Sequence, residues 1–475
     1  MNEPWEIEDF LEIRENQLHI DGVNAIELGA THGTPLFVYS EKRIRHNIER
    51  LRKSASVIDC PLKLCYAAKA MSTMGILRAV KDADCDIEVN SGGELWKVLK
   101  AGFRGEQIIF NGTSKEEWEI ELAIENSIYA IQVDSIFELS LIEKTANRLE
   151  KKANVSLRLV PDIKTGTHSG LQTALLTSKF GMMPEEAFKA CRTYKESANV
   201  RIDGIHLHIG SQNPEPGAYE AALQMLFDSM RRIYDETGIE LKHVNLGGGF
   251  PVNYLRDASL ESEMPYEQRQ MFSADFEPSK AIGDAWATVT TIASDSDAKH
   301  LLDDMTLLLE PGRSIIADAG LCLTSVRNKK TRPVEDEAIS NRNSRIENDT
   351  WLLTDAGFNI LLSMETYKWY YHLISAKRAD AEHKTAYKIA GPLCDGGDVY
   401  FDHEGSGRLP DHRLLPENVE PGEVLALLNC GAYALAQASQ YNGRFLPPVI
   451  LIKDNGKAEL IRRRESFEDL IGSDL

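Results

Sequence analysis

Reactive side chains lie at the points where four β-rich runs of the chain end. Lys69 follows LKLCYAA, His208 lies in GIHLHIG, and glycines 247–249 end HVNLGGG. Glu310 ends TLLLE, and Arg313 comes three residues later. Singly, each has an ordinary explanation, because a strand-end lysine is usually a solvated charge and consecutive glycines usually form a turn. Together they supply an amine nucleophile, an imidazole, a backbone cradle for phosphate, a carboxylate and a guanidinium.

The elements that position these groups alternate between residues 40 and 315. β-rich runs are separated by amphipathic stretches such as EKRIRHNIERL, in which Ile44, Ile48 and Leu51 share one helical face. This alternation predicts parallel strands, and eight runs fit a closed (β/α)8 TIM-like barrel, with an open doubly wound sheet as the alternative. The runs are LKLCYAA, CDIEV, QIIFN, YAIQV, VSLRLV, GIHLHIG, HVNLG and TLLLE.

A barrel would gather the reactive groups at one rim. The active site of such a fold lies at the carboxyl ends of its strands, and phosphate commonly binds after strands seven and eight. The glycine run and the Glu310–Arg313 segment follow those two strands. The combination describes a site for a phosphate-bearing aldehyde held as a Schiff base, namely pyridoxal 5'-phosphate.

The remaining segments have a different pattern. After residue 315, runs such as TWLLTDAG and PPVILIK are short and broken by Gly, Pro and Asp, which predicts an antiparallel β domain. We expect an N-terminal segment at 1–38 that joins this β domain, a cofactor-binding barrel at 39–314 and the C-terminal β domain at 315–475. Residues 327–349 have almost no apolar side chains and are predicted to form an exposed loop.

Composition excludes several classes of protein. The 475 residues carry a net charge of −20, which disfavours nucleic acid and membrane surfaces as partners. Because no apolar run is long enough to span a bilayer, we expect a cytoplasmic protein. The seven cysteines are scattered without a CxxC pair, which argues against a disulfide framework and against a metal site.

Seven motifs resemble the signature of one enzyme family. The resemblance runs from GTPLFVYSEKRIR at residue 33 to the C-terminus. The motifs, in chain order, are YAAKA, NSGGEL, HLHIGSQ, NLGGGFP, LEPGRS, GPLCDGGD and NCGAYALAQASQYN. They are similar to those of the alanine-racemase-fold (fold type III, group IV) pyridoxal-phosphate decarboxylases, which include diaminopimelate and eukaryotic-type ornithine decarboxylases. The resemblance implies an N-terminal barrel, a C-terminal β domain and a head-to-tail homodimer with shared active sites.

The resemblance also implies roles for individual residues. Lys69 matches the lysine that forms the Schiff base, His208 the imidazole on the pyridine ring, and Glu310 the carboxylate at the ring nitrogen. Glu88 stands where the family usually has Asp, so its side chain is one methylene longer. Contacts to the phosphate are expected from Ser211, Gly248, Gly249, Gly312, Arg313 and Tyr433.

The reaction follows from the acid groups. A carboxylate at the ring nitrogen favours the protonated ring, which withdraws electrons and suits loss of CO2. The related racemases place an arginine there, so Glu310 argues against racemisation. By resemblance, Cys394 of GPLCDGGD is the partner subunit's acid that protonates the product. The predicted catalytic residues are therefore Lys69, His208 and Cys394.

The substrate is predicted from residues near its far end. By resemblance, Asp395 and Asp355 meet a distal ammonium, and Arg313, Tyr367 and Tyr433 complete the substrate-binding set. Diaminopimelate enzymes have an arginine for the second carboxylate at the position of Ser363. We therefore expect a basic amino acid of the ornithine or lysine type, which would release CO2 and a diamine.

Several alternatives stay open. The segment YKWYYH at 367–372 looks most similar to bacterial D-ornithine/D-lysine decarboxylases, and the D configuration depends on that resemblance alone. Diaminopimelate itself, or a larger amino-acid adduct of siderophore or antibiotic biosynthesis, is the alternative substrate. A non-catalytic regulatory homologue is disfavoured because Lys69 and Cys394 are both present.

Overall fold

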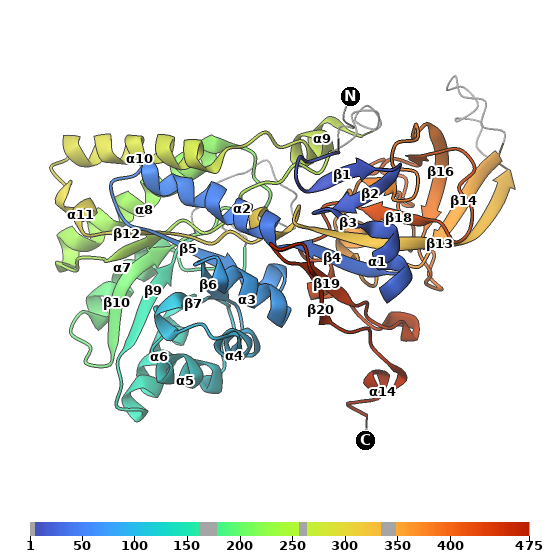
Figure 1. The fold of residues 1–475 in the computed structure, drawn as a ribbon. Coiled ribbons are helices and arrows are strands. Elements are labelled where there is room, and N and C mark those ends of the chain that lie inside the picture. Colours follow the sequence, from blue (N-terminus) through green and yellow to red (C-terminus); the bar gives the residue numbers. More distant parts are fainter. Residues whose placement is uncertain (1–4, 161–177, 256–263, 334–347, 475) are drawn as a thin grey trace. The chain divides into compact units, whose positions relative to one another are not determined.

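The computed structural model describes residues 5–160, 178–255, 264–333 and 348–474. These residues form two compact units (Figure 1). The β-rich unit comprises 1–43, 253–273 and 316–475, and the barrel unit comprises 44–252 and 274–315. In the described residues, no helix has both the length and the apolar character needed to cross a membrane.

The barrel unit is a closed ring of eight parallel strands in the order β10-β11-β12-β5-β6-β7-β8-β9. This confirms the predicted (β/α)8 barrel, and each of the eight predicted runs overlaps a strand. Most residues of these strands are buried, as expected of strands that are covered on both faces. The strands are β5 (Leu62–Ala67), β6 (Asp86–Val89), β7 (Ile108–Phe110), β8 (Ala130–Val133), β9 (Ala153–Arg158), β10 (Val200–His206), β11 (His243–Asn245) and β12 (Thr306–Leu309).

Helices follow the strands and surround the ring (Figure 1). Several start at a side-chain cap; Ser91 accepts from the backbone N–H of Glu94, and Ser135 accepts from that of Glu138. The helices are α2 (Glu41–Arg52), α3 (Met74–Asp82), α4 (Gly92–Ala101), α5 (Glu117–Glu125), α6 (Ile136–Arg148), α7 (Pro184–Tyr194), α8 (Pro216–Thr237), α10 (Pro278–Asp295), α11 (His300–Asp303) and α12 (Arg313–Ile316).

The β-rich unit is built on a sheet whose main path runs β17-β16-β14-β13-β4-β19-β20; β18 also pairs with β13, and β15 pairs with β18. Strand β4 (Leu36–Ser40) is antiparallel to β13 (Gly320–Pro333) and parallel to β19 (Val449–Ile452). The other strands are β14 (Asn348–Thr354), β15 (Leu373–Ser375), β16 (Thr385–Ala390), β17 (Arg413–Leu415), β18 (Val424–Leu427) and β20 (Ala458–Arg462).

The same unit contains a small N-terminal sheet and four short helices. Apolar side chains from both ends of the chain share one core, which includes Leu18, Val38, Leu323 and Ile450. The remaining elements are β1 (Leu11–Arg14), β2 (Gln17–Ile20), β3 (Val23–Asn24), α1 (Ala25–His32), α9 (Tyr266–Phe272), α13 (Leu362–Thr366) and α14 (Phe467–Leu470).

The expected loop at 327–349 is wrong in its described part. Residues 327–333 continue β13 and pair with β14, so that Lys330 lies opposite Trp351 and Pro333 opposite Asn348. Their side chains are mostly exposed, which explains why a paired strand there lacks the apolar alternation expected of a half-buried one. Residues 334–347 lie outside the described part of the chain.

Candidate active site

The barrel brings the predicted rim residues together. Lys69 lies in a single 3-10 turn (Ala68–Ala70) directly after β5, and Glu88 lies near the end of β6. His208 follows β10 by two residues, and Glu310 follows β12 directly. Burial dominates the pKa shifts of both Glu310 and His208; the charge of the Lys69 ammonium opposes the rise in the Glu310 pKa and adds to the fall in the His208 pKa.

Two buried carboxyl groups share one amide at this rim. The Asn111 side chain donates from Nδ2 to Glu88 Oε1 at 2.9 Å and to Glu310 Oε1 at 3.0 Å. Asn245 Nδ2 also donates to Glu310 Oε1, at 2.7 Å. The other oxygen of Glu88, Oε2, is buried without a hydrogen-bond partner among the described residues. The longer side chain of Glu88 is therefore accommodated next to Glu310, with one oxygen left for a further donor.

Glu310 is held as a weak acid. Burial, followed by the negative charge of Glu88, raises the pKa of its carboxyl to about 7. Lys69, Asn245 and Asn111 oppose this rise by stabilising the carboxylate. Glu310 therefore exchanges its proton near neutral pH.

This pKa predicts a pH-dependent stability. Because the folded pKa lies above the ordinary 4.5, the folded state binds more protons than the unfolded state between about pH 4.5 and pH 7. As the pH rises from about 4.5 to about 7, the free energy of unfolding of cofactor-free protein should therefore fall, by up to about 3 kcal/mol from this group. The Glu310→Gln variant removes the titration. Its stability gain over wild type in urea should be larger at pH 8 than at pH 4.5, and an equal difference at both pH values would contradict the assignment.

The glycine run packs against the histidine. Gly248 donates its backbone N–H to His208 Nδ1 at 3.1 Å, so the imidazole carries its proton on Nε2. Burial, followed by Lys69 and Arg158, lowers the pKa of His208 well below its usual range, so the ring is neutral. A Cβ on Gly248 would lie 2.3 Å from the carbonyl oxygen of Glu310, and one on Gly249 would lie 2.2 Å from that of Gly210. Only glycine permits this close approach of backbones.

The residues assigned to phosphate lie in the same unit, except for Tyr433. Gly312 and Arg313 are buried at the start of α12, and Ser211 is half-buried after β10. The N–H of Ala67, at the end of β5, donates to the carbonyl of Pro311 at 3.0 Å, which ties this segment to the lysine strand. Gly248 gives its N–H to His208, so a phosphate contact at Gly248 would compete with that bond.

Sequence analysis missed four polar residues of this rim. Asn111 and Asn245 are the donors to the carboxyl pair, and His206 Nε2 lies 3.6 Å from Glu310 Oε2. Arg158 ends β9, is nearly buried, and stacks on Phe180 with its guanidinium carbon 4.4 Å from the ring centroid. Each stands at or directly after the end of an observed strand and inside one of the predicted β-rich runs, and that position was the available signal.

The predicted acid and the predicted substrate residues other than Arg313 lie in the β-rich unit. Cys394 and Asp395 are consecutive exposed residues on the turn 391–398, and Cys394 is the exposed one among the seven cysteines. Tyr367 and Tyr433 are half-buried, and Tyr433 has the left-handed φ of 58°. Ser363 is buried, and its hydroxyl donates to Gln437 Oε1 at 3.5 Å.

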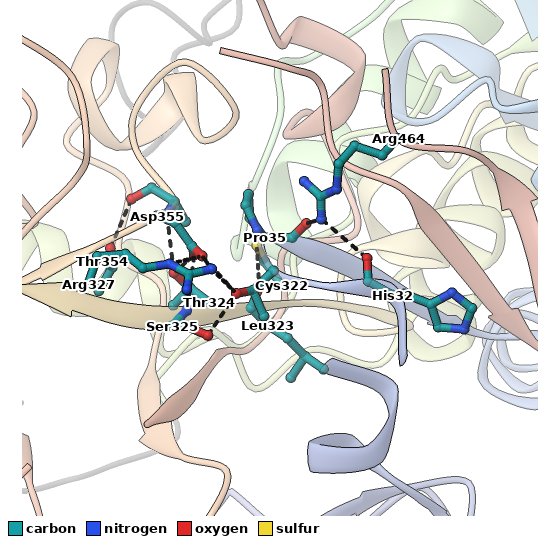
Figure 2. Close-up of polar contacts among 12 residues, drawn as sticks. His32, Pro35, Cys322, Leu323, Thr324, Ser325, Arg327, Thr354, Asp355 and Arg464 are labelled. Carbon is teal, nitrogen blue, oxygen red and sulfur yellow. Dashed lines mark hydrogen bonds and ion pairs between the residues drawn. The ribbon is translucent and has the colours of Figure 1, made fainter. Parts of the chain in front are cut away.

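Asp355, predicted to meet a distal ammonium, is already surrounded by donors (Figure 2). Its Oδ1 accepts from the Thr324 hydroxyl at 2.7 Å and from the backbone N–H of Ser325 at 3.0 Å. Its Oδ2 accepts from the Thr34 hydroxyl at 2.7 Å and from Arg327, whose Nη2 lies 2.6 Å away. A substrate ammonium would have to displace Arg327, so these contacts favour a structural role for Asp355.

Comparisons with known proteins show which family the chain resembles. Residues 41–317 match the family model described as pyridoxal-dependent decarboxylase, pyridoxal binding domain. Diaminopimelate decarboxylase from Methanocaldococcus jannaschii is 34% identical over 98% of this chain and 97% of its own, and that from Aquifex aeolicus is 31% identical with the same coverage. The crystal structure of the M. jannaschii enzyme in complex with L-lysine superposes with a TM-score of 0.82 at 33% identity, covering 98% of each chain.

Proposed function

The chain belongs to the pyridoxal-dependent decarboxylases, and we propose from this premise that it removes CO2 from diaminopimelate to give lysine. It is a carboxy-lyase with pyridoxal phosphate as its cofactor. The observation that carries the proposal is similarity along the whole chain to relatives named diaminopimelate decarboxylase. Those relatives do not carry the name D-ornithine/D-lysine decarboxylase, so the narrower resemblance receives no support from them.

The rim residues fit this cofactor. Lys69 supplies the amine for the aldehyde, and Glu310, with a pKa of about 7, suits a ring nitrogen that shares its proton. The partnerless oxygen of Glu88 provides a second buried acceptor close by. When bound, the cofactor supplies an electron-withdrawing ring that stores the electron pair released with CO2.

The protein groups then have separate tasks. A protonated ring nitrogen beside Glu310 would lower the pKa of the Glu310 carboxyl. Glu310 would then be ionised, and its negative charge would favour the proton on the ring nitrogen. His208, neutral and anchored by Gly248, offers a flat face without adding positive charge next to Lys69. The thiol of Cys394, which the family resemblance assigns to the partner subunit of a homodimer, is proposed to give a proton to the substrate carbon that has lost CO2. The Asp395 carboxylate is proposed to bind the distal ammonium.

Ser363 favours a second candidate, decarboxylation of lysine or ornithine. Its hydroxyl meets Gln437, and the nearby Lys368 is paired with Glu365 at 3.1 Å. Neither gives a distal carboxylate the bidentate partner that a guanidinium would supply. A larger adduct without a free distal carboxylate fits the same observation.

One screen tests the proposal. Purified holoenzyme is given meso-diaminopimelate and both enantiomers of lysine and ornithine, and CO2 release is measured for each. We expect diaminopimelate to give the highest kcat/KM. Release from lysine or ornithine, with none from diaminopimelate, would replace the proposal by the second candidate.

A substitution at Ser363 tests the distal pocket. Ser363→Arg should lower KM for diaminopimelate roughly tenfold, as expected of one added charge-assisted pair, with little effect on lysine or ornithine. Ser363→Met controls for the larger volume at this buried position. If the folded arginine variant gains nothing over the methionine variant on diaminopimelate, the assignment of this segment to the distal end is wrong.

A further inference from the structure

The turn that carries Cys394 and Asp395 is held from inside the β-rich unit by Asp398. This buried carboxylate accepts from the backbone N–H of Leu393 at 2.8 Å and from that of Phe358 at 2.8 Å. A Cβ on Gly391 would lie 2.3 Å from its Oδ2, so the chain packs directly against it. The base of the turn is therefore fixed, while Cys394 and Asp395 project from it.

A second segment, 441–444, holds the exposed part of the turn. Asn442 Oδ1 accepts from the backbone N–H of Cys394 at 2.7 Å, and the Tyr441 hydroxyl donates to Asp395 Oδ2 at 3.2 Å. Arg444 donates to the carbonyl of Pro392 at 2.8 Å. These contacts come from three residues of one short segment and reach the stretch 392–395.

The conformation of segment 441–444 is stabilised by the residue types at 441 and 442. Asn442 has φ 55° and ψ 24°, a left-handed conformation that asparagine tolerates better than most residues. The Tyr441 ring stacks on Phe358, with ring centroids 5.9 Å apart and planes 20° apart. Phe358 is also the residue whose N–H meets Asp398. The two supports of the turn therefore meet at Phe358.

We propose that Asn442 and Tyr441 are positioning residues for the decarboxylation, which hold the Cys394 thiol and the Asp395 carboxylate where the substrate meets them. The proposal rests on the functions proposed above for Cys394 and Asp395. Asn442 sets the backbone of the proton donor, so its loss should affect the protonation step. Tyr441 orients one carboxylate oxygen while Gly397 N–H occupies the other at 2.9 Å, so its loss should affect substrate binding.

Two variants at Asn442 separate the hydrogen bond from the backbone conformation. Asn442→Gly keeps the left-handed turn and removes the acceptor, whereas Asn442→Asp keeps an acceptor. In the holoenzyme we expect the glycine variant to lose roughly tenfold in kcat with KM little changed. It should also raise the fraction of turnovers in which the proton goes to the cofactor carbon, so that hydrolysis of the C=N bond by water leaves pyridoxamine phosphate and an aldehyde in place of the amine product. The aspartate variant should retain most of the wild-type behaviour.

Tyr441→Phe keeps the stack on Phe358 and removes the hydroxyl. It should raise KM several-fold for substrates with a distal amine, with kcat within about twofold of wild type. Wild-type kcat and product partition in Asn442→Gly, or equal impairment of both Asn442 variants, would overturn the role of Asn442. An unchanged KM in Tyr441→Phe would overturn that of Tyr441.

A labelling measurement keeps the inference independent of the substrate. Cys394 is exposed and the other six cysteines are buried, so iodoacetamide labelling followed by mass spectrometry reports on this thiol. Labelling should be several-fold faster in Asn442→Gly than in Asn442→Asp or wild type, and equal rates would contradict the positioning role. If no amino acid in the screen releases CO2 while the labelling difference is present, the proposed function fails and the positioning contact stands.

Discussion

Replacing Lys69 with alanine should abolish decarboxylation, with a loss of roughly 10⁴-fold or more in kcat. The amine is proposed to hold the cofactor aldehyde covalently, and its charge opposes the burial-driven rise in the pKa of Glu310. Its removal therefore takes away the anchor and the charge that stabilises the Glu310 carboxylate. The visible absorbance of the lysine-bound cofactor should be lost, which a spectrum of the protein with added pyridoxal phosphate would show.

Lys100→Ala is a matched control for this variant. Lys100 is an exposed lysine of α4, away from the strand ends. It should leave both the spectrum and kcat unchanged. An unaltered visible spectrum in Lys69→Ala would mean that another amine binds the aldehyde, and the assignment of the rim would then be wrong.

Replacing Cys394 with alanine should slow turnover by roughly 10²- to 10⁴-fold, the usual contribution of a positioned general acid. The cofactor should stay bound, because the thiol lies in the β-rich unit and the cofactor residues named above, apart from Tyr433, lie in the barrel. The remaining turnovers should end more often with the proton at the cofactor carbon. Kinetics of CO2 release, together with analysis of pyridoxamine phosphate, measure both effects.

Cys60→Ala controls for the loss of a thiol as such. Cys60 lies before β5, is buried, and has a pKa raised to about 11 by that burial, so it is not an acid suited to neutral pH. Its replacement should leave the ratio of the two products unchanged. Clean decarboxylation at the wild-type rate in Cys394→Ala would exclude the thiol as the acid.

The barrel could be predicted because short β-rich runs alternate with amphipathic helices. Runs such as VSLRLV and GIHLHIG overlap β9 and β10, and α7 lies between these two strands. The extension of β13 could not be predicted in the same way, because Lys329 and Lys330 lie on an exposed ladder where backbone pairing alone makes the strand. Hydrophobic periodicity reports burial, and an exposed hairpin has none.

Only those residues of the site that lie in recognisable motifs could be predicted from the sequence. Lys69, His208 and Glu310 follow strand ends, and the structure places them at one rim. Asn111 and Asn245 carry no distinctive motif, although they decide how the buried carboxyl groups are satisfied. The roles assigned to the other site residues stay predictions. The contact expected of Asp355, which directly follows β14, depends on where its carboxylate points. The four groups that donate to this carboxylate belong to residues distant in sequence, so the sequence did not reveal them.

The position of β4 between β13 and β19 has a consequence for biosynthesis. When β4 leaves the ribosome, neither neighbour has been translated, and β19 emerges only after the whole barrel. The nascent chain must therefore carry an apolar strand with two open edges throughout most of translation. Stalled or truncated products that end before residue 449 should aggregate through this strand, whereas the barrel can acquire its structure while synthesis continues.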